Sequence, residues 1–183
     1  DYIPFCSTLL AFSNYMLPSI RLSAMMKLSV IYFFTHDSIL IGEDGPTHQP
    51  IEQIAQLRAI EGLTVFRPSD ASELLACYQY ALSNAGPVAI ILAKNQMEAV
   101  ESKFKGALSG GYVLKSGKKD AKVTIIASGT EVALALKVQQ ELEKRVATSV
   151  VSMPCTQIFD KQSPAYKSKV LSREVKLAIE ASN

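Results

Sequence analysis

The residues best suited to chemistry lie together in one short segment, residues 35–50. Both histidines of the chain, His36 and His48, fall inside it, and Asp44 lies between them. An apolar run ending at Phe34 leads into the segment, and a helix-like run follows it. Ligands of open α/β sheets bind beyond the carboxyl ends of the strands, in the loops that follow. The sequence therefore predicts an active-site loop between a buried strand and a helix.

Each of these residues also has a structural interpretation. His36 could fill the end of a sheet, and Asp44 could be a loop acid held by backbone amides. Thr47 could cap a helix that begins at Pro50, which would place His48 at a helix start. The positive potential there would favour a neutral imidazole. The clustering of two histidines with several acids favours the functional interpretation.

Two further sets of candidates lie outside this loop. Leu9, Phe12 and Tyr15 are spaced at i, i+3 and i+6. This spacing is more often a core stripe than the wall of a cofactor site. Lys94 follows the apolar run Val88–Leu92, where a basic side chain could hold a phosphate or could simply be exposed. The residues alone leave both pairs of alternatives open.

Composition restricts the class of protein. A chain of 183 residues fits one large domain or two small ones, and 48% hydrophobic residues suffice for a core. The net charge is +2, and no lysine and arginine cluster is interleaved with aromatics, which argues against a nucleic-acid surface. No apolar run approaches the roughly 20 residues that cross a bilayer, so we expect no membrane partner. The three cysteines form neither a disulfide framework nor a zinc spacing, which predicts a reduced, cytoplasmic protein.

Apolar runs and helical periodicity alternate along the first part of the chain. We expect strands at residues 28–34, 63–66 and 88–92. We expect helices at residues 17–27, from Pro50 onward, and from Ser69 or Asp70 to about Asn84. The order of strand, helix and strand implies right-handed crossovers and a parallel sheet.

A second α/β pattern begins at residue 123. It predicts strands at 123–127, 148–153 and 175–179 and a helix at 131–145. Residues 98–122 are rich in glycine and lysine, and we interpret them as a linker with a short strand at 111–115. The predicted domains are therefore 1–97 and 123–183. The chain begins without Met and ends just after a predicted strand, so we expect a piece of a longer polypeptide.

The segment Thr35–Pro50 closely resembles the sugar-site motif of the transketolase family, which reads much like THDSI-x-x-GEDGPTHQP. The resemblance covers almost the whole chain. It implies a thiamine-diphosphate-binding (pyrimidine) domain that lacks its N-terminal part, followed by the first half of the family's C-terminal domain. The implied reaction transfers a two-carbon ketol unit from a ketose phosphate to an aldose phosphate in the pentose phosphate pathway.

The resemblance also implies a role for each candidate residue. As catalytic residues, His48 would transfer protons and stabilise a developing alkoxide, and His36 would contact the donor's hydroxyls or phosphate. Asp44 would accept a hydrogen bond from the C2 hydroxyl of the acceptor. Phe12 and Tyr15 match the family's TFL-x-F-x-x-Y segment, whose aromatics stack on the aminopyrimidine ring. Leu9 replaces the first aromatic, so the cofactor pocket keeps an apolar contact but loses one ring.

One departure and two absences qualify the resemblance. Lys94 stands where the family typically has the arginine of Ser-Arg-Gln on the sugar phosphate, so it keeps the charge without the bidentate fork. No Gly-Asp-Gly motif for metal and diphosphate occurs in the chain. In the family this motif lies in an N-terminal domain that binds Mg²⁺ or Ca²⁺, so we expect no metal ligands here. The glutamate that contacts the pyrimidine is expected shortly before Asp1.

The family's cofactor lies between two subunits, so a homodimer with sugar-phosphate substrates is implied. The isolated chain is expected to be inactive. Deoxyxylulose-phosphate synthase shares the DGPTHQ core but lacks the His-Asp-Ser-Ile lead-in. Two alternatives stay open: a formaldehyde-using relative of transketolase, and a non-catalytic assembly or regulatory half. Leu9 and Lys94 are mild signs of decay, whereas the intact loop residues argue against it.

Overall fold

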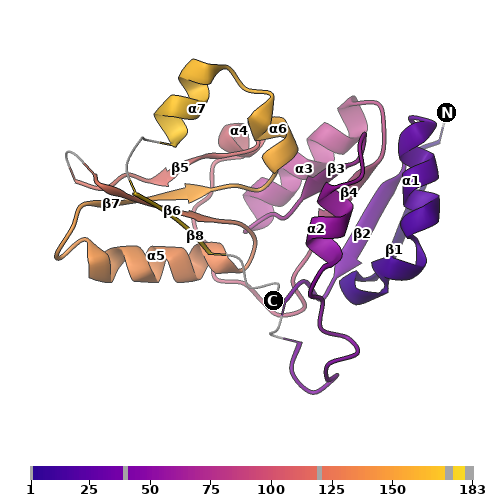
Figure 1. Ribbon diagram of the computed structural model, residues 1–183, viewed down its shortest axis with the longest axis horizontal. Coiled ribbons are helices and arrows are strands. Elements are labelled where there is room, and N and C mark those ends of the chain that lie inside the picture. The colour runs from indigo at the N-terminus through magenta and orange to yellow at the C-terminus, as the bar shows by residue number, and fades with distance from the viewer. Residues whose placement is uncertain (1, 39–40, 119–120, 172–174, 180–183) are drawn as a thin grey trace. The chain divides into compact units, whose positions relative to one another are not determined.

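The computed structural model describes residues 2–38, 41–118, 121–171 and 175–179. The chain divides into two compact units (Figure 1). Among the described residues, unit 1 comprises those through Pro68 together with Cys77–Gln96, and unit 2 comprises Ser69–Ala76 together with residues 97–179. Each unit contains one sheet, so the predicted α/β class is confirmed. The exact domain boundaries proposed from the sequence stay predictions.

Unit 1 is built on a fully parallel sheet. Its strands are β1 (Phe5–Leu9), β2 (Ile31–Thr35), β3 (Thr64–Phe66) and β4 (Val88–Ile91), in the spatial order β1-β2-β4-β3. The three predicted strands are confirmed with small shifts at their ends, and β1 was not predicted. Because all four strands are parallel, their carboxyl ends lie at one edge of the sheet.

Helices cover both faces of this sheet. On one face, Ile20 of α1 (Leu17–Met25) and Ile54 of α2 (Gln53–Arg58) pack in one cluster with Phe34 of β2. On the other face, the ring of Phe33 lies 5.6 Å from that of Tyr78 in α3 (Ala71–Ser83). Two-sided coverage explains why the strands are continuous apolar runs in the sequence.

The start of α3 confirms a predicted cap. Oδ1 of Asp70 accepts hydrogen bonds from the backbone N–H groups of Ser72 at 3.0 Å and Glu73 at 3.1 Å. These are two of the amide groups that a helix start leaves without intrahelical partners. Asp70 therefore fixes the point at which the chain leaves the site edge and enters α3.

The start of α2 differs from the prediction. The helix expected from Pro50 begins only at Gln53, because the Gln53 side chain accepts the Ile51 N–H at 2.7 Å and holds a turn there. The N-cap position is Glu52, and no side chain caps it. The alternative interpretation of Thr47 as a helix cap is therefore wrong, and His48 does not lie in the first turn of a helix.

Unit 2 contains a mixed sheet. Its strands are β5 (Tyr112–Lys115), β6 (Val123–Ala127), β7 (Thr148–Ser152) and β8 (Val175–Ile179), in the order β5-β7-β6-β8. The strand β5 is antiparallel to β7, and the other pairs are parallel. In Figure 1, α5 (Glu131–Leu142) lies along one face, and α6 (Thr156–Asp160) and α7 (Pro164–Val170) lie on the other. Neither α6 nor α7 was predicted.

The stretch predicted as a linker, residues 98–122, contains the short helix α4 (Phe104–Ala107) as well as β5. Its glycines lie in tight packing. A Cβ added at Gly106 would overlap the ring of Tyr112, and one added at Gly110 would overlap the backbone at Phe159 and Cys155. These glycines therefore allow close approach rather than flexibility.

A buried carboxylate joins three segments of unit 2. Glu73 is fully buried and accepts hydrogen bonds from the hydroxyls of Tyr112 at 2.8 Å and Ser152 at 2.6 Å. Its other oxygen accepts the backbone N–H of Ser69 at 2.7 Å. Burial and the neighbouring carboxylate raise the pKa of the Tyr112 phenol, so that the phenol stays a donor to Glu73.

Cys6, Cys77 and Cys155 are all free thiols. In the described part of the chain, every helix is too short or too polar to cross a bilayer.

Candidate functional site

The candidate residues follow the carboxyl ends of the strands of unit 1. The 3₁₀ helix η1 (Leu10–Tyr15), which carries Phe12 and Tyr15, begins directly after β1. His36 follows β2, and Lys94 comes shortly after β4. Because these strand ends share one edge, the sheet gathers side chains that are far apart in the sequence.

Two glycine turns shape the loop between β2 and α2. Gly42 and Gly45 have φ values of 77° and 78°, a region that residues with a side chain rarely adopt. The N–H of Gly45 donates to the carbonyl of Gly42 at 3.3 Å, and the N–H of His48 donates to that of Gly45 at 3.1 Å. The positive φ values therefore explain why glycine stands at both positions. Ile39 and Leu40 of the motif lie outside the described residues.

Both histidines are held in the same way. Oγ1 of Thr35 lies 2.9 Å from Nδ1 of His36, and Oγ1 of Thr47 lies 2.9 Å from Nδ1 of His48. In each case the hydroxyl of the preceding threonine engages one ring nitrogen. The partner of one nitrogen decides the tautomer, so this arrangement leaves Nε2 as the nitrogen that can face a ligand.

An aromatic wall stands beside His48. The Phe12 ring centroid lies 5.1 Å from that of the His48 imidazole in an edge-on arrangement, and 6.2 Å from that of Tyr15. Phe12, Tyr15, Pro46, Thr47 and the neighbouring residues line a hollow of about 290 Å³. Tyr15 is 86% exposed, although a tyrosine ring gains much from being covered. The wall therefore suits a flat heteroaromatic ligand.

Leu9 lies at the end of β1, where its Cα pairs in register with that of Thr35. It is partly buried and is not among the residues that line the hollow. The structure thus places Leu9 beside the strand that leads to His36, and its contact with a cofactor stays a proposal.

Asp44 and Lys94 form an ion pair. Lys94 Nζ lies 3.1 Å from Asp44 Oδ2, 3.0 Å from the carbonyl oxygen of Ile41 and 3.7 Å from Glu43 Oε1. The hydrogen bond from Lys94 lowers the pKa of Asp44, and the charges of both histidines act in the same direction. The same bond raises the pKa of Lys94. Lys94 therefore closes the loop onto β4 instead of projecting into solvent.

One buried ion pair at this edge of the sheet was not predicted from the sequence. Asp37, next to His36, forms a buried ion pair with Arg67, which follows β3. The available signal was an acid after one apolar run and an arginine after another. Recognising it requires the strand order, because β4 lies between β2 and β3 in the sheet.

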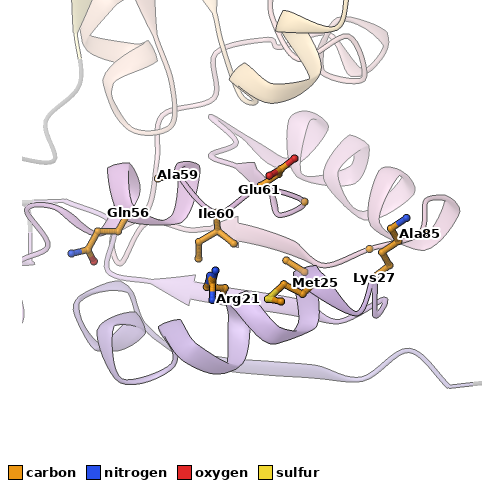
Figure 2. Close-up of a pocket in the computed structure, with 11 residues that line it drawn as sticks. Arg21, Met25, Lys27, Gln56, Ala59, Ile60, Glu61 and Ala85 are labelled. Carbon is orange, nitrogen blue, oxygen red and sulfur yellow. The ribbon is translucent and has the colours of Figure 1, made fainter.

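A larger hollow lies at the opposite, amino ends of the strands. It has a volume of about 720 Å³ and is lined by residues that include Arg21, Met25 and Ile60 (Figure 2). None of the sequence-predicted site residues lines it. We assign the candidate site to the smaller hollow, because Phe12 and Tyr15 line it and the His48 imidazole packs against Phe12.

Across residues 2–38, 41–118, 121–171 and 175–179, no group of three or more His, Cys, Asp or Glu side chains could hold a metal ion. The side chains at the site can supply proton transfer, hydrogen bonding to hydroxyls and stacking on an aromatic ring.

Two family models match the chain. Residues 1–99 match the pyrimidine-binding domain of transketolase, and residues 110–183 match the transketolase-like C-terminal domain. The first match alone covers more than half of the chain and contains every residue of the candidate site.

Curated relatives match along nearly the whole chain. Transketolase of Halalkalibacterium halodurans is 46% identical over 96% of this chain, and transketolase of Bacillus subtilis is 44% identical over 96%. The chain spans 28% of the length of each of these relatives.

Solved structures show the same fold. Transketolase from Leishmania mexicana superposes with a TM-score of 0.95 at 41% identity, covering 98% of this chain and 27% of that one. A structure described as a split gene transketolase, inactive beta4 tetramer, gives a TM-score of 0.77 at 31% identity. It covers 96% of this chain and 57% of its own.

Proposed function

The chain belongs to the transketolase family, and we propose that it supplies the pyrimidine-binding part of a transketolase active site. The proposed enzyme transfers a two-carbon ketol unit from a ketose phosphate to an aldose phosphate. One observation carries the proposal: Phe12 and Tyr15 line the hollow at the carboxyl edge of the unit 1 sheet, and the His48 imidazole packs edge-on against Phe12.

The residues present fit one end of thiamine diphosphate. The exposed ring of Tyr15 and the ring of Phe12 offer an uncovered aromatic surface for the aminopyrimidine. When bound, the cofactor supplies a carbanion at its thiazolium carbon. The residues of this chain hold the pyrimidine end and orient the substrate.

The diphosphate end requires residues that this chain does not supply. The sequence has no Gly-Asp-Gly motif, and the chain spans only 28% of the matched relatives. We propose that other segments bind the diphosphate with Mg²⁺ or Ca²⁺ and that two subunits form the site, as the family resemblance implies. We refer to this chain joined with those segments as the complete enzyme. Free thiols suit the cytoplasmic location we propose.

The two histidines have different proposed roles. His48, packed against Phe12 and held at Nδ1 by Thr47, presents Nε2 for proton transfer and for stabilising an alkoxide on the substrate. His36, held at Nδ1 by Thr35, contacts the hydroxyls or the phosphate of the donor. Both rings are only partly buried, so a substrate can reach them.

Lys94 and Asp44 are proposed to bind the substrate as a pair. Lys94 uses one bond for the Ile41 carbonyl and one for Asp44, so a phosphate must share its remaining donor or replace Asp44. Asp44 Oδ2 is taken by Lys94, and the second carboxylate oxygen is the one proposed to accept the acceptor's hydroxyl. The loop conformation is thereby linked to substrate binding.

The isolated chain, supplied with thiamine diphosphate and Mg²⁺, is expected to show no ketol transfer, because half of the cofactor site is elsewhere. The complete enzyme is expected to be active. A coupled assay with a ketose phosphate and an aldose phosphate measures both. Activity of the isolated chain would contradict the shared site, and an inactive complete enzyme that still binds cofactor would support a non-catalytic half. The structure described as an inactive beta4 tetramer belongs to a split-gene relative.

Asp44→Ala in the complete enzyme is expected to reduce discrimination between 2-hydroxy and 2-deoxy acceptor aldehydes, by roughly tenfold in the ratio of kcat/KM values. A bond to the C2 hydroxyl contributes only when that hydroxyl is present. Steady-state kinetics with a matched acceptor pair measure the ratio. Glu43→Ala is the control, because Glu43 lies in the same loop at 3.7 Å from Lys94. An equal loss for both acceptors would remove Asp44 from this role.

A further inference from the structure

A buried ion pair lies next to the candidate site and takes no part in the proposed chemistry. Nε and Nη2 of Arg67 donate to the same carboxylate oxygen, Oδ2 of Asp37, at 3.1 Å and 2.8 Å. Arg67 is 1% exposed and Asp37 is 2% exposed. Arg67 is also among the largest fully buried side chains in the described part of the chain.

The pair connects two strands that are not neighbours. Asp37 comes two residues after the end of β2, and Arg67 follows β3 directly. In the sheet, β4 lies between these strands. The guanidinium therefore spans the carboxyl end of β4 and ties the loop after β2 to the loop after β3. This is the edge from which all candidate residues project.

Stability alone gives a weak reason for such a pair. Removing two charges from water is costly, and apolar side chains of similar volume often stabilise a core equally well. A planar guanidinium that donates two hydrogen bonds to one carboxylate instead fixes the relative positions of the two side chains. A geometric role requires a nearby group whose orientation matters.

His36 is that group. Its φ is 62°, a left-handed conformation that is uncommon for a residue with a side chain. Such a conformation persists only when the surrounding structure enforces it. On one side, Thr35 is fixed in β2 by its register with β1. On the other side, Asp37 is fixed by Arg67.

We propose that Arg67 and Asp37 are positioning residues for His36: their buried ion pair fixes the left-handed turn after β2 and so directs the imidazole toward the donor substrate. The inference rests on the proposed function, in which His36 contacts the donor. The pair itself touches no substrate. A purely structural pair is the alternative, and the two make different predictions.

The decisive variant removes both charges at once. Asp37→Asn with Arg67→Met in the complete enzyme leaves no unpaired charge in the core, so the protein folds even where either single variant fails. We expect kcat/KM for the donor to fall roughly tenfold, because a small displacement of a contact group is costly. In a His36→Ala background the same double change is expected to alter kcat/KM by less than about twofold.

The matched control is the exposed pair Lys137 and Glu98, which lies in unit 2 with a separation of 2.7 Å. Neutralising it should leave donor kinetics unchanged in both backgrounds. A purely structural role of the buried pair would lower the melting temperature or the active fraction equally with and without the His36 imidazole. Equal losses in the two backgrounds, or donor kinetics like those of the parent, would overturn the inference.

A second readout does not depend on activity. The imidazole ¹⁵N signals of His36, assigned by comparison with His36→Ala, report its tautomer and its bond to Thr35. The double variant should shift these signals and leave those of His48 unchanged. Unchanged His36 signals would overturn the inference. The complete enzyme could lack ketol transfer while the double variant still shifts the His36 signals. That result would contradict the proposed function and support the positioning role.

Discussion

His48→Ala is expected to lower kcat of the complete enzyme by about 10²- to 10⁴-fold, the range that a positioned proton-transfer group contributes. The imidazole packs edge-on against Phe12 and is held at Nδ1 by Thr47, so Nε2 has a defined direction. Alanine removes the proton-transfer group and keeps the aromatic wall. Cofactor affinity should therefore change much less than kcat.

Steady-state and single-turnover kinetics with a saturating ketose phosphate measure this effect, and fluorescence titration measures cofactor binding. Thr47→Val is the matched variant, because it keeps the ring but removes its hydroxyl partner. Its loss should be smaller, roughly threefold to tenfold, as expected for one hydrogen bond. A His48→Ala enzyme with the kcat of its parent would remove His48 from proton transfer.

Glu73→Ala is expected to lower the free energy of unfolding by about 2–4 kcal/mol, because it leaves three buried donors without an acceptor. Those donors are the hydroxyls of Tyr112 and Ser152 and the backbone N–H of Ser69. Urea unfolding measures the change. Glu141→Ala, at an exposed pair with Lys144, is the control and should have little effect.

The same carboxylate makes stability depend on pH. Burial raises the pKa of Glu73, although the donors from Ser152, Ser69 and Tyr112 oppose the shift. The folded state therefore binds this proton up to a higher pH than the unfolded state does. Stability is full below the ordinary glutamate range and falls as the pH rises through the raised value. In Glu73→Gln this dependence should disappear, and a slope that persists would assign it to another group.

Much of the fold could be predicted from apolar runs. The strands β6 and β8 were predicted to the residue, because each is a short apolar run with clear boundaries. The edge strand β1 was missed because Ser7 and Thr8 interrupt its apolar pattern. The start of α2 was misplaced because a side chain, that of Gln53, takes the amide of Ile51. Rules for where a helix begins do not predict that a nearby side chain will accept this hydrogen bond.

The candidate site was foreseen in part. The loop histidines and Asp44 were found because their motif is contiguous in the sequence. The contact between Phe12 and His48 needed the pairing of β1 with β2, which the sequence did not predict. Lys94 was expected to face a phosphate, and its bonds to Asp44 and Ile41 depend on the path of the loop. Contacts between residues that follow different strands depend on the order of those strands in the sheet.

The structure of residues 98–122 also affects where unit 2 can be cut from the chain. A recombinant fragment beginning at residue 123 would lack β5, which covers the outer edge of β7. That edge would then expose unpaired backbone groups beside the apolar residues Val150 and Val151. Edges of this kind recruit strands from other molecules, so such a fragment should aggregate. A fragment that starts before α4 keeps this edge strand and should aggregate less.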